Sequence, residues 1–216
     1  MFFFTKNKTL KKYKSYRAVG KELNDKIIER YMSREIVLLS GKYLGIIRKD
    51  NLIFDNESES VALMDFVINE CRINNKTTVE LYKEKVTVDN DIENEILDGL
   101  INSYTSLFKI TCINRSEKKL ILADVLKNND NPIEIIDIGS SQTAAPGLLI
   151  FTRLVPLPDF NITGGFGFPF KEESEEILLK EYKQITKRVR SSDESIKRYV
   201  AFFKLFKRHG IETDFL

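Results

Sequence analysis

SLFKITCINRSEKKLILADVLKNNDNPIEIIDIG, residues 106–139, contains three short runs rich in Ile, Leu, Val, Phe and Thr, separated by the polar links NRSEK and KNNDN. Runs of this kind, bounded by turn-forming residues, are typical of β-strands. The pattern continues in GLLIFTRLVPL (147–157) and FNITGGFGF (160–168). Five strands with links this short predict an antiparallel sheet or a small barrel, because a parallel crossover usually needs a helix between its strands.

A helical pattern begins the chain. Over residues 9–39 the apolar side chains recur mostly at steps of three and four, which predicts one long helix or two, broken near Gly41 and Gly45. Residues 44–56, LGIIRKDNLIFDN, then predict two short extended pieces around a turn at 49–51.

Three N-cap patterns predict further helices in the first half of the chain. Asn56, Thr77 and Asn90 are each followed three residues later by a glutamate, as in a capping box. Apolar residues at helical spacing then extend from Asn56 to about Arg72, and from Asn90 to Leu100.

The last zone is predicted to hold two helices. Apolar residues share one face up to Val189, and after Ser191 and Ser192 a second stripe runs through RYVAFFKLFKRH, residues 198–209. No internal repeat and no low-complexity linker is present. The sequence therefore predicts an α+β protein with one shared core, made of a helical region (1–103), an antiparallel β region (104–170) and C-terminal helices (171–216).

The composition predicts a cytoplasmic protein with no membrane span. No apolar run approaches the roughly 18 to 20 residues that cross a bilayer, and the opening MFFFTKNK is too short in apolar residues for a signal peptide. Cys71 and Cys112, the two cysteines of the chain, are expected to remain buried thiols.

Few side chains are available for catalysis. The single histidine, His209, lies near the C-terminus, so we expect no catalytic residue, no metal site and no cofactor. IIDIGSSQT (135–143) resembles the first phosphate hairpin of the actin-like ATPases, in which Asp137, Ser140 and Ser141 would serve magnesium and phosphate. ITGGFG (162–167) resembles that family's adenosine-site glycines, but the two motifs belong to different domains of a much larger fold. An enzyme around Asp137 and Ser140 is thus the weakest alternative.

The glycines of these two segments are expected to shape loops. TGGFGFP lacks the spacing of a phosphate-binding loop, and the acidic EESEE (172–176) that follows would repel a phosphate. We expect the glycines to permit positive backbone angles or close packing against the neighbouring phenylalanines. The residues concerned are Gly139, Gly147, Gly164, Gly165 and Gly167.

Charge is segregated along the chain. Residues 1–49 hold 13 Lys and Arg against 4 Asp and Glu, residues 50–100 hold 4 against 13, and residues 180–208 hold 10 against 3. The basic ends, where aromatic residues are interleaved, can bind RNA or a ribosome. They can equally be amphipathic helices with a packed apolar face, whose lysines are solvated or face acidic segments of the fold or of a second subunit. The candidate RNA-binding residues are Lys8, Lys11, Lys12, Lys14, Arg17, Lys204, Lys207 and Arg208.

Two stretches, LGIIRKDNLIFDNESESVALMDFVINE (44–70) and IIDIGSSQTAAPGLLIFTRLVPLPDFNITGGFGFP (135–169), are similar to a family of small bacterial proteins of the cyanobacterial type with no assigned function. The resemblance covers about residues 40–170 and brings no catalytic residue. It implies that the turn at 139–147 and the glycines at 164–167 belong to one unit.

Together these patterns predict a non-enzymatic cytoplasmic binding or assembly protein. Its expected partner is another protein or a second copy of the chain, as a homo-oligomer. The first alternative is an RNA- or ribosome-associated protein, and the second is the nucleotide-dependent enzyme or hydrolase.

Overall fold

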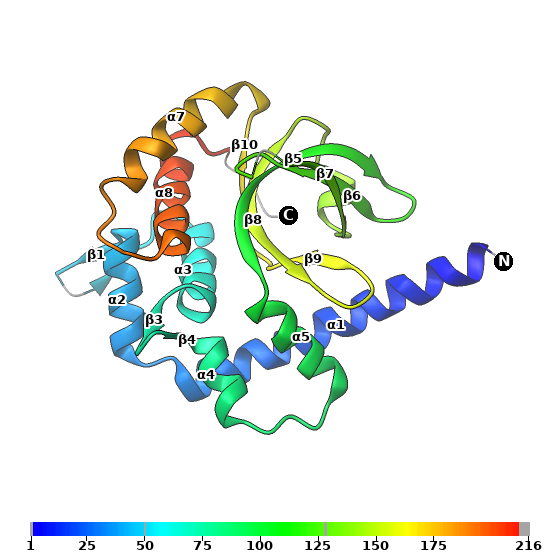
Figure 1. Ribbon diagram of the computed structural model, residues 1–216, viewed down its shortest axis with the longest axis horizontal. Helices are drawn as coiled ribbons and strands as arrows, with labels where there is room; N and C mark the ends of the chain where they lie inside the picture. The colour runs from blue at the N-terminus through cyan, green and yellow to red at the C-terminus, as the bar shows by residue number, and fades with distance from the viewer. Residues whose placement is uncertain (1, 50, 128, 212–216) are drawn as a thin grey trace.

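The fold combines a small β-barrel with helices that come before and after it in the chain (Figure 1). The computed structural model describes residues 2–49, 51–127 and 129–211, and side chains from residue 8 onward except at 129 and 130. A helical N-terminal half, the barrel and two C-terminal helices confirm the predicted α+β class.

Five strands close the barrel. β5 pairs with β6 and with β8, β6 pairs with β7, and β9 completes the ring between β8 and β7. The β7–β9 pairing is parallel, although the prediction was antiparallel. The chain passes through β8 between these two strands, so the parallel pair needs no long crossover helix. The strands are β5 (Tyr104–Asn114), β6 (Lys119–Asp124), β7 (Asn129–Ile136), β8 (Leu149–Pro156) and β9 (Asn161–Thr163).

Around the barrel the strands follow the order β5-β6-β7-β9-β8, and a short helix, α6 (Ser140–Thr143), lies between β7 and β8 in the chain. This arrangement is that of the OB barrel. A further strand, β10 (Phe168–Phe170), pairs with β8 outside the ring. The single strand predicted at 160–168 is therefore divided, because Gly164 and Gly165 turn the chain between β9 and β10. Gly165 has a φ of 94°, in the left-handed region.

Two helices begin the chain, α1 (Phe2–Tyr31) and α2 (Arg34–Leu44). The break between them lies just before α2, where the Ser33 hydroxyl accepts a hydrogen bond as N-cap. The predicted break at Gly41 is wrong, because this glycine lies inside α2 and packs closely on the following hairpin. Gly45, with a φ of 76°, does end α2.

Two small hairpins follow in the helical half. β1 (Ile47–Arg48) pairs with β2 (Asn51–Leu52) around the predicted turn, of which Asp50 lies outside the described residues. β3 (Arg72–Ile73) pairs in the same way with β4 (Lys76–Thr77).

All three predicted N-caps are formed. The side chains of Asn56, Thr77 and Asn90 each accept a hydrogen bond from the backbone N–H of the glutamate three residues on. Only Thr77 makes the full capping box, in which its glutamate bonds back to the cap residue. The helices that begin here are α3 (Glu57–Asn69), α4 (Thr78–Lys85) and α5 (Asp91–Ile101).

Two helices follow the barrel, α7 (Glu175–Thr186) and α8 (Glu194–His209), after a short 3₁₀ turn over Glu172–Ser174. Asp193 caps α8 by accepting hydrogen bonds from the backbone N–H groups of Ser195 and Ile196.

The largest apolar cluster draws on all three zones of the chain. It contains Ile36 and Phe66 from the first half, Leu107 and Phe151 from the barrel, and Phe202 from α8. The rings of Phe151 and Phe202 stack with centroids 4.4 Å apart, which fixes α8 against the barrel. Within the described residues, no helix is both long and apolar enough to span a bilayer.

Candidate functional site

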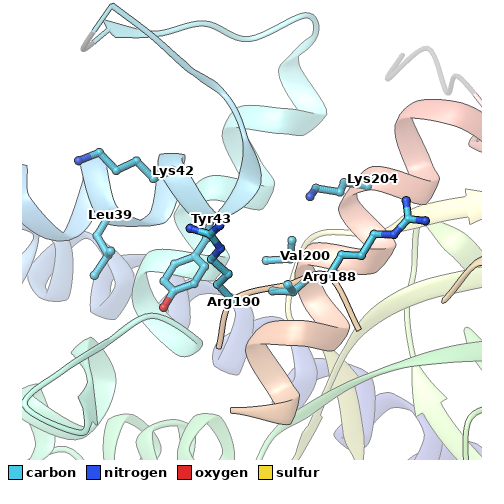
Figure 2. Close-up of a pocket in the computed structure, with 8 residues that line it drawn as sticks. Leu39, Lys42, Tyr43, Arg188, Arg190, Val200 and Lys204 are labelled. Carbon is cyan, nitrogen blue, oxygen red and sulfur yellow. The ribbon is translucent and has the colours of Figure 1, made fainter. Parts of the chain in front are cut away.

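A pocket of about 250 Å³ lies among α2, the segment that joins α7 to α8, and α8 itself (Figure 2). We call it the basic pocket. Its polar lining is Lys42 and Tyr43 from α2, Arg188 and Arg190 from the joining segment, and Lys204 from α8. Leu39, Val189 and Val200 supply an apolar wall.

Among the residues that the structure describes, the four cations of the basic pocket have no acidic partner. No carboxylate lines the pocket, and none of the four side chains makes an ion pair within the described part of the chain. Lys207, one turn beyond Lys204 on α8, differs because its Nζ lies 2.6 Å from Asp55 and 2.7 Å from Glu59. The basic pocket thus holds a local excess of positive charge.

A second surface feature is the exposed apolar segment, residues 53–61, between β2 and the first turns of α3. Ile53, Phe54 and Val61 are each about 40% exposed. They are three of the five large apolar side chains that are exposed in the described residues, and the other two, Ile101 and Ile177, lie on different helices. Because Lys207 binds Asp55 within this segment, α8 connects the segment to the basic pocket.

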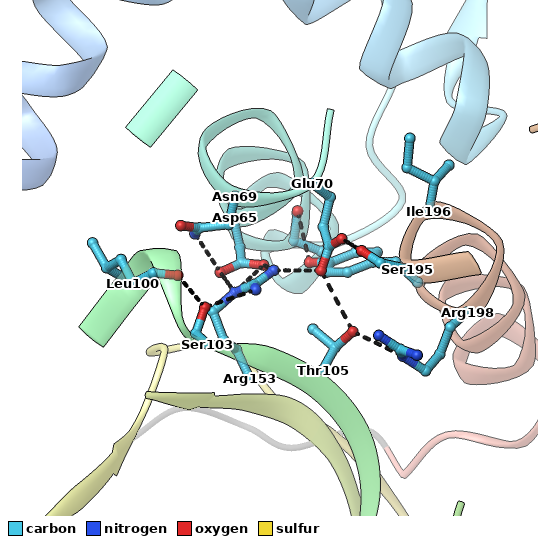
Figure 3. Close-up of polar contacts among 12 residues, drawn as sticks. Asp65, Asn69, Glu70, Leu100, Ser103, Thr105, Arg153, Ser195, Ile196 and Arg198 are labelled. Carbon is cyan, nitrogen blue, oxygen red and sulfur yellow. Dashed lines mark hydrogen bonds and ion pairs between the residues drawn. The ribbon is translucent and has the colours of Figure 1, made fainter. Parts of the chain in front are cut away.

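A buried ionic network lies between the barrel and the helices (Figure 3). Arg153 on β8 is fully buried and binds Asp65 through two nitrogens, each at 2.9 Å, and Glu70 at 2.7 Å. A third nitrogen donates to the Ser103 hydroxyl at 3.1 Å. Burial lowers the pKa of Arg153, but the charges of Asp65 and Glu70 outweigh burial and raise it.

Glu70 extends this network to two further elements. It accepts hydrogen bonds from Thr105 of β5 and from the Ser195 hydroxyl in the first turn of α8. Burial raises the pKa of the Glu70 carboxyl, although the neighbouring Arg153 acts in the opposite direction. The network therefore joins α3, α8 and two barrel strands, and its main consequence is to hold these elements together.

A cavity of about 150 Å³ opens beside the network. Arg72 in its wall is bound to Glu80 and Asp193, and Arg198 donates to the Thr105 hydroxyl. Burial raises the pKa of Tyr104 to about 12, so this phenol keeps its proton at neutral pH. The charged groups here are largely engaged with one another, which favours a structural role over acid–base chemistry.

The predicted RNA-binding residues near the N-terminus divide into two groups. Lys12 is bound to Asp159, and Arg17 donates to the Thr163 carbonyl at 3.0 Å. Lys8, Lys11 and Lys14 are exposed and have no ion pair among the residues that the structure describes.

The predicted residues near the C-terminus are divided as well. Lys207 and Arg208 bind acidic side chains, whereas Lys204 lines the basic pocket. The structure does not bring this group to the N-terminal one, because α8 lies beside α7 and the start of α1 extends past the barrel (Figure 1). The interleaved aromatic residues are packed in the core and are not free to stack on bases. Tyr13, Tyr16, Tyr199, Phe202 and Phe203 are buried, and the partly buried Phe206 stacks on Phe168 with ring centroids 4.5 Å apart.

Asp137, Ser140 and Ser141, the residues proposed for an enzyme, stabilise the loop after β7 by hydrogen bonds. Asp137 accepts one hydrogen bond from the Ser140 backbone at 2.8 Å and one from the Thr163 hydroxyl at 3.2 Å. Ser141 is buried and donates to the Ile138 carbonyl. Because Thr163 precedes Gly164, these contacts join the 139–147 turn to the glycine segment, as the resemblance implies.

The loop glycines have two structural functions. Gly147 and Gly165 have φ values of 92° and 94°. A Cβ on Gly164 or Gly167 would lie 2.9 or 2.8 Å from a side chain of β8, whereas Gly139 has an ordinary φ of −65°. The close contacts are made with Arg153 and Ile150, so the expected packing against phenylalanines is wrong.

Both cysteines are free, but only Cys71 is buried. Cys112 is exposed on β5, which corrects the expectation of two buried thiols. The His209 ring lies 3.3 Å from Glu181. The described residues contain no group of three His, Cys, Asp or Glu side chains that could hold a metal ion.

The surfaces that OB barrels use for oligonucleotides are modified here. Such barrels bind on the second and third strands and on the loops that join the first strand to the second and the fourth to the fifth. β6 and β7 contain no aromatic residue. In the last of these loops, 157–160, Phe160 packs against Tyr16 of α1 with ring centroids 5.5 Å apart, whereas Pro158 and Asp159 are exposed. The second and third strands of this barrel therefore offer no aromatic side chain on which a base could stack.

These features define an α+β barrel protein with a buried ionic network, a basic pocket and an exposed apolar segment. Residues 7–216 match the model of a family of unknown function, DUF7986, and the chain belongs to that family. This confirms the expected membership of a family with no assigned function, whereas the bacterial origin of its members stays a prediction. No curated protein matches the chain, and no solved structure does.

Proposed function

We propose that the chain is a non-enzymatic binding protein of the cytoplasm whose partner is another protein. The observation that carries this proposal is the concentration of exposed apolar side chains in segment 53–61. Isolated apolar residues are common on protein surfaces, but a group of them in one segment is typical of an interaction site.

The charges around the segment suggest the chemistry of the partner. Arg48 and Lys49 are exposed at the β1–β2 turn, and Lys204 of the basic pocket lies one turn before Lys207, which binds Asp55 of the segment. An apolar partner surface that also carries carboxylates would complement both features, because charge complementarity at the rim of an interface increases the association rate and the specificity.

A photo-crosslinking residue at Phe54, expressed in the native cells, tests the proposal. The matched control is the same residue at Ile177, which has 43% exposure on α7. We expect a discrete protein adduct from position 54 and none from position 177. An adduct of twice the chain's mass would identify a second copy as the partner. The absence of any adduct, or equal adducts from both positions, would contradict the proposal.

RNA association is the second candidate, favoured by the unpaired Lys8, Lys11 and Lys14 on α1. Lysines in such a row can contact phosphates without sequence specificity. Replacing all three by glutamine should then abolish salt-sensitive co-purification of RNA, while the same change at Lys180, Lys183 and Lys187 should not. RNA that co-purifies equally with both triple variants, or with neither the wild type nor the variants, would exclude this candidate.

A further inference from the structure

We propose that the basic pocket binds a small polyphosphorylated anion, such as an organic pyrophosphate. This site does not depend on the proposed protein partner. It is carried by four cationic side chains from three segments, placed around one hollow with no carboxylate in its lining.

The electrostatics of the pocket favour an anionic ligand. Lys42, Arg188, Arg190 and Lys204 place four positive charges in the lining of a pocket of about 250 Å³, and no acidic side chain of the described residues lines it. Elsewhere on α8 the opposite arrangement is found, because Lys207 and Arg208 are bound to carboxylates. A bound anion would offset this excess of positive charge and would gain charge-assisted hydrogen bonds.

The kind of cation favours phosphate over carboxylate. Arginine presents a planar fork of donors that matches two phosphate oxygens, and lysine adds a point charge. A single carboxylate would leave most of the positive charge uncompensated. A pyrophosphate group carries several negative charges on two adjacent centres, which suits two arginines and two lysines.

The size and wall of the pocket favour an organic group on the phosphate. About 250 Å³ exceeds the space that one phosphate needs, and Leu39, Val189 and Val200 add apolar surface to the lining. In Figure 2, Leu39 and Val200 lie on either side of Tyr43. Ligand sites commonly combine such an apolar wall with a few polar groups that fix the orientation of the ligand. A nucleoside di- or triphosphate belongs to the proposed class.

Calorimetric titration at low salt tests the site with three probes: orthophosphate, pyrophosphate and adenosine triphosphate. We expect binding of pyrophosphate and of the nucleotide, with the nucleotide the tighter because its organic part reaches the apolar wall. Arg190→Glu and Lys204→Glu should each weaken binding about tenfold or more. Arg190→Lys should weaken binding less, because it keeps the charge but removes the fork.

Lys187→Glu is the matched control, since it makes the same charge change in the same segment outside the pocket lining. It should leave the affinity within about twofold of the wild type. Unfolding midpoints without ligand show whether each variant is folded. The inference is overturned by the absence of pyrophosphate binding at millimolar concentration, by equal binding of orthophosphate, or by a Lys187→Glu effect as large as that of Arg190→Glu.

Discussion

At the scale of single residues, the buried Arg153 connects barrel strand β8 to Asp65 of α3 and to Glu70 just after it. Its guanidinium is paired with Asp65 and Glu70, which lie 88 and 83 residues away in the chain, so local sequence patterns could not predict the network. In the folded protein the buried guanidinium is tolerated because it is paired with two carboxylates and its donors are hydrogen-bonded.

Arg153→Met is therefore expected to lower the free energy of unfolding by about 3–5 kcal/mol, because it leaves two buried carboxylates without their cation. Urea unfolding measures this loss. Arg198→Met is the control, since Arg198 donates to the Thr105 hydroxyl at 3.3 Å and is only partly buried. It should cost about 1 kcal/mol. Equal losses in the two variants would contradict the role assigned to the network.

Two helical glycines make a second comparison at this scale. A Cβ on Gly99 of α5 would lie 2.7 Å from the Pro156 carbonyl oxygen, whereas a Cβ on Gly20 of α1 would meet nothing closer than 3.8 Å. Gly20→Ala should stabilise the protein by about 0.5–1 kcal/mol, because alanine favours the helix. Gly99→Ala should destabilise the protein, because the backbone of α5 or of β8 must move to make room for the new Cβ. Thermal unfolding distinguishes the two, and stabilisation by both substitutions would show that α5 does not pack this closely on β8.

At the scale of elements, the starts of helices were predicted correctly where the full capping-box pattern is present in the sequence. Asn56, Thr77 and Asn90 were predicted as caps because a glutamate follows each at the third position. Ser33 and Asp193 also cap helices, but Ile36 and Ile196 stand at that position, and the capping-box pattern is absent. The break between α1 and α2 was consequently predicted at a glycine instead.

The cap of α8 predicts a pH dependence. Burial raises the pKa of Asp193, but hydrogen bonds from Arg72 and from the Ser195 backbone outweigh burial and lower it from its ordinary value of 3.8. A lowered pKa means that the carboxylate contributes stability at a pH above 3.8 and loses it as the pH falls through the folded-state value. Asp193→Ala should cost about 1–2 kcal/mol at pH 7.

Unfolding free energies between about pH 7 and pH 2 check this prediction. The difference between the wild type and Asp193→Ala should shrink as the carboxylate is protonated. Asp193→Asn keeps a capping oxygen without the charge, so its loss at pH 7 should be smaller. A difference between the wild type and Asp193→Ala that stays constant across this range would contradict the assignment.

At the scale of the whole molecule, the sequence predicted five strands in an antiparallel sheet or a small barrel, but not which strands pair to close the barrel. Five strands and a small barrel follow from the apolar runs, whereas the parallel β7–β9 pair involves a strand of only three residues. The basic pocket was missed for a related reason. Lys42 and Lys204 come from opposite ends of the chain, and only the tertiary structure places them around one hollow. Of its cations, only Lys204 was a predicted site residue.

Hydrogen–deuterium exchange on the complex purified from native cells tests the central claim, a protein partner docked on the exposed apolar segment. Relative to the free chain, the account predicts new protection over residues 47–64, which span the β1–β2 hairpin and the first turns of α3, and none on α7. Protection over residues 8–17 with no change over 47–64 would contradict it and would place the partner on the lysines of α1.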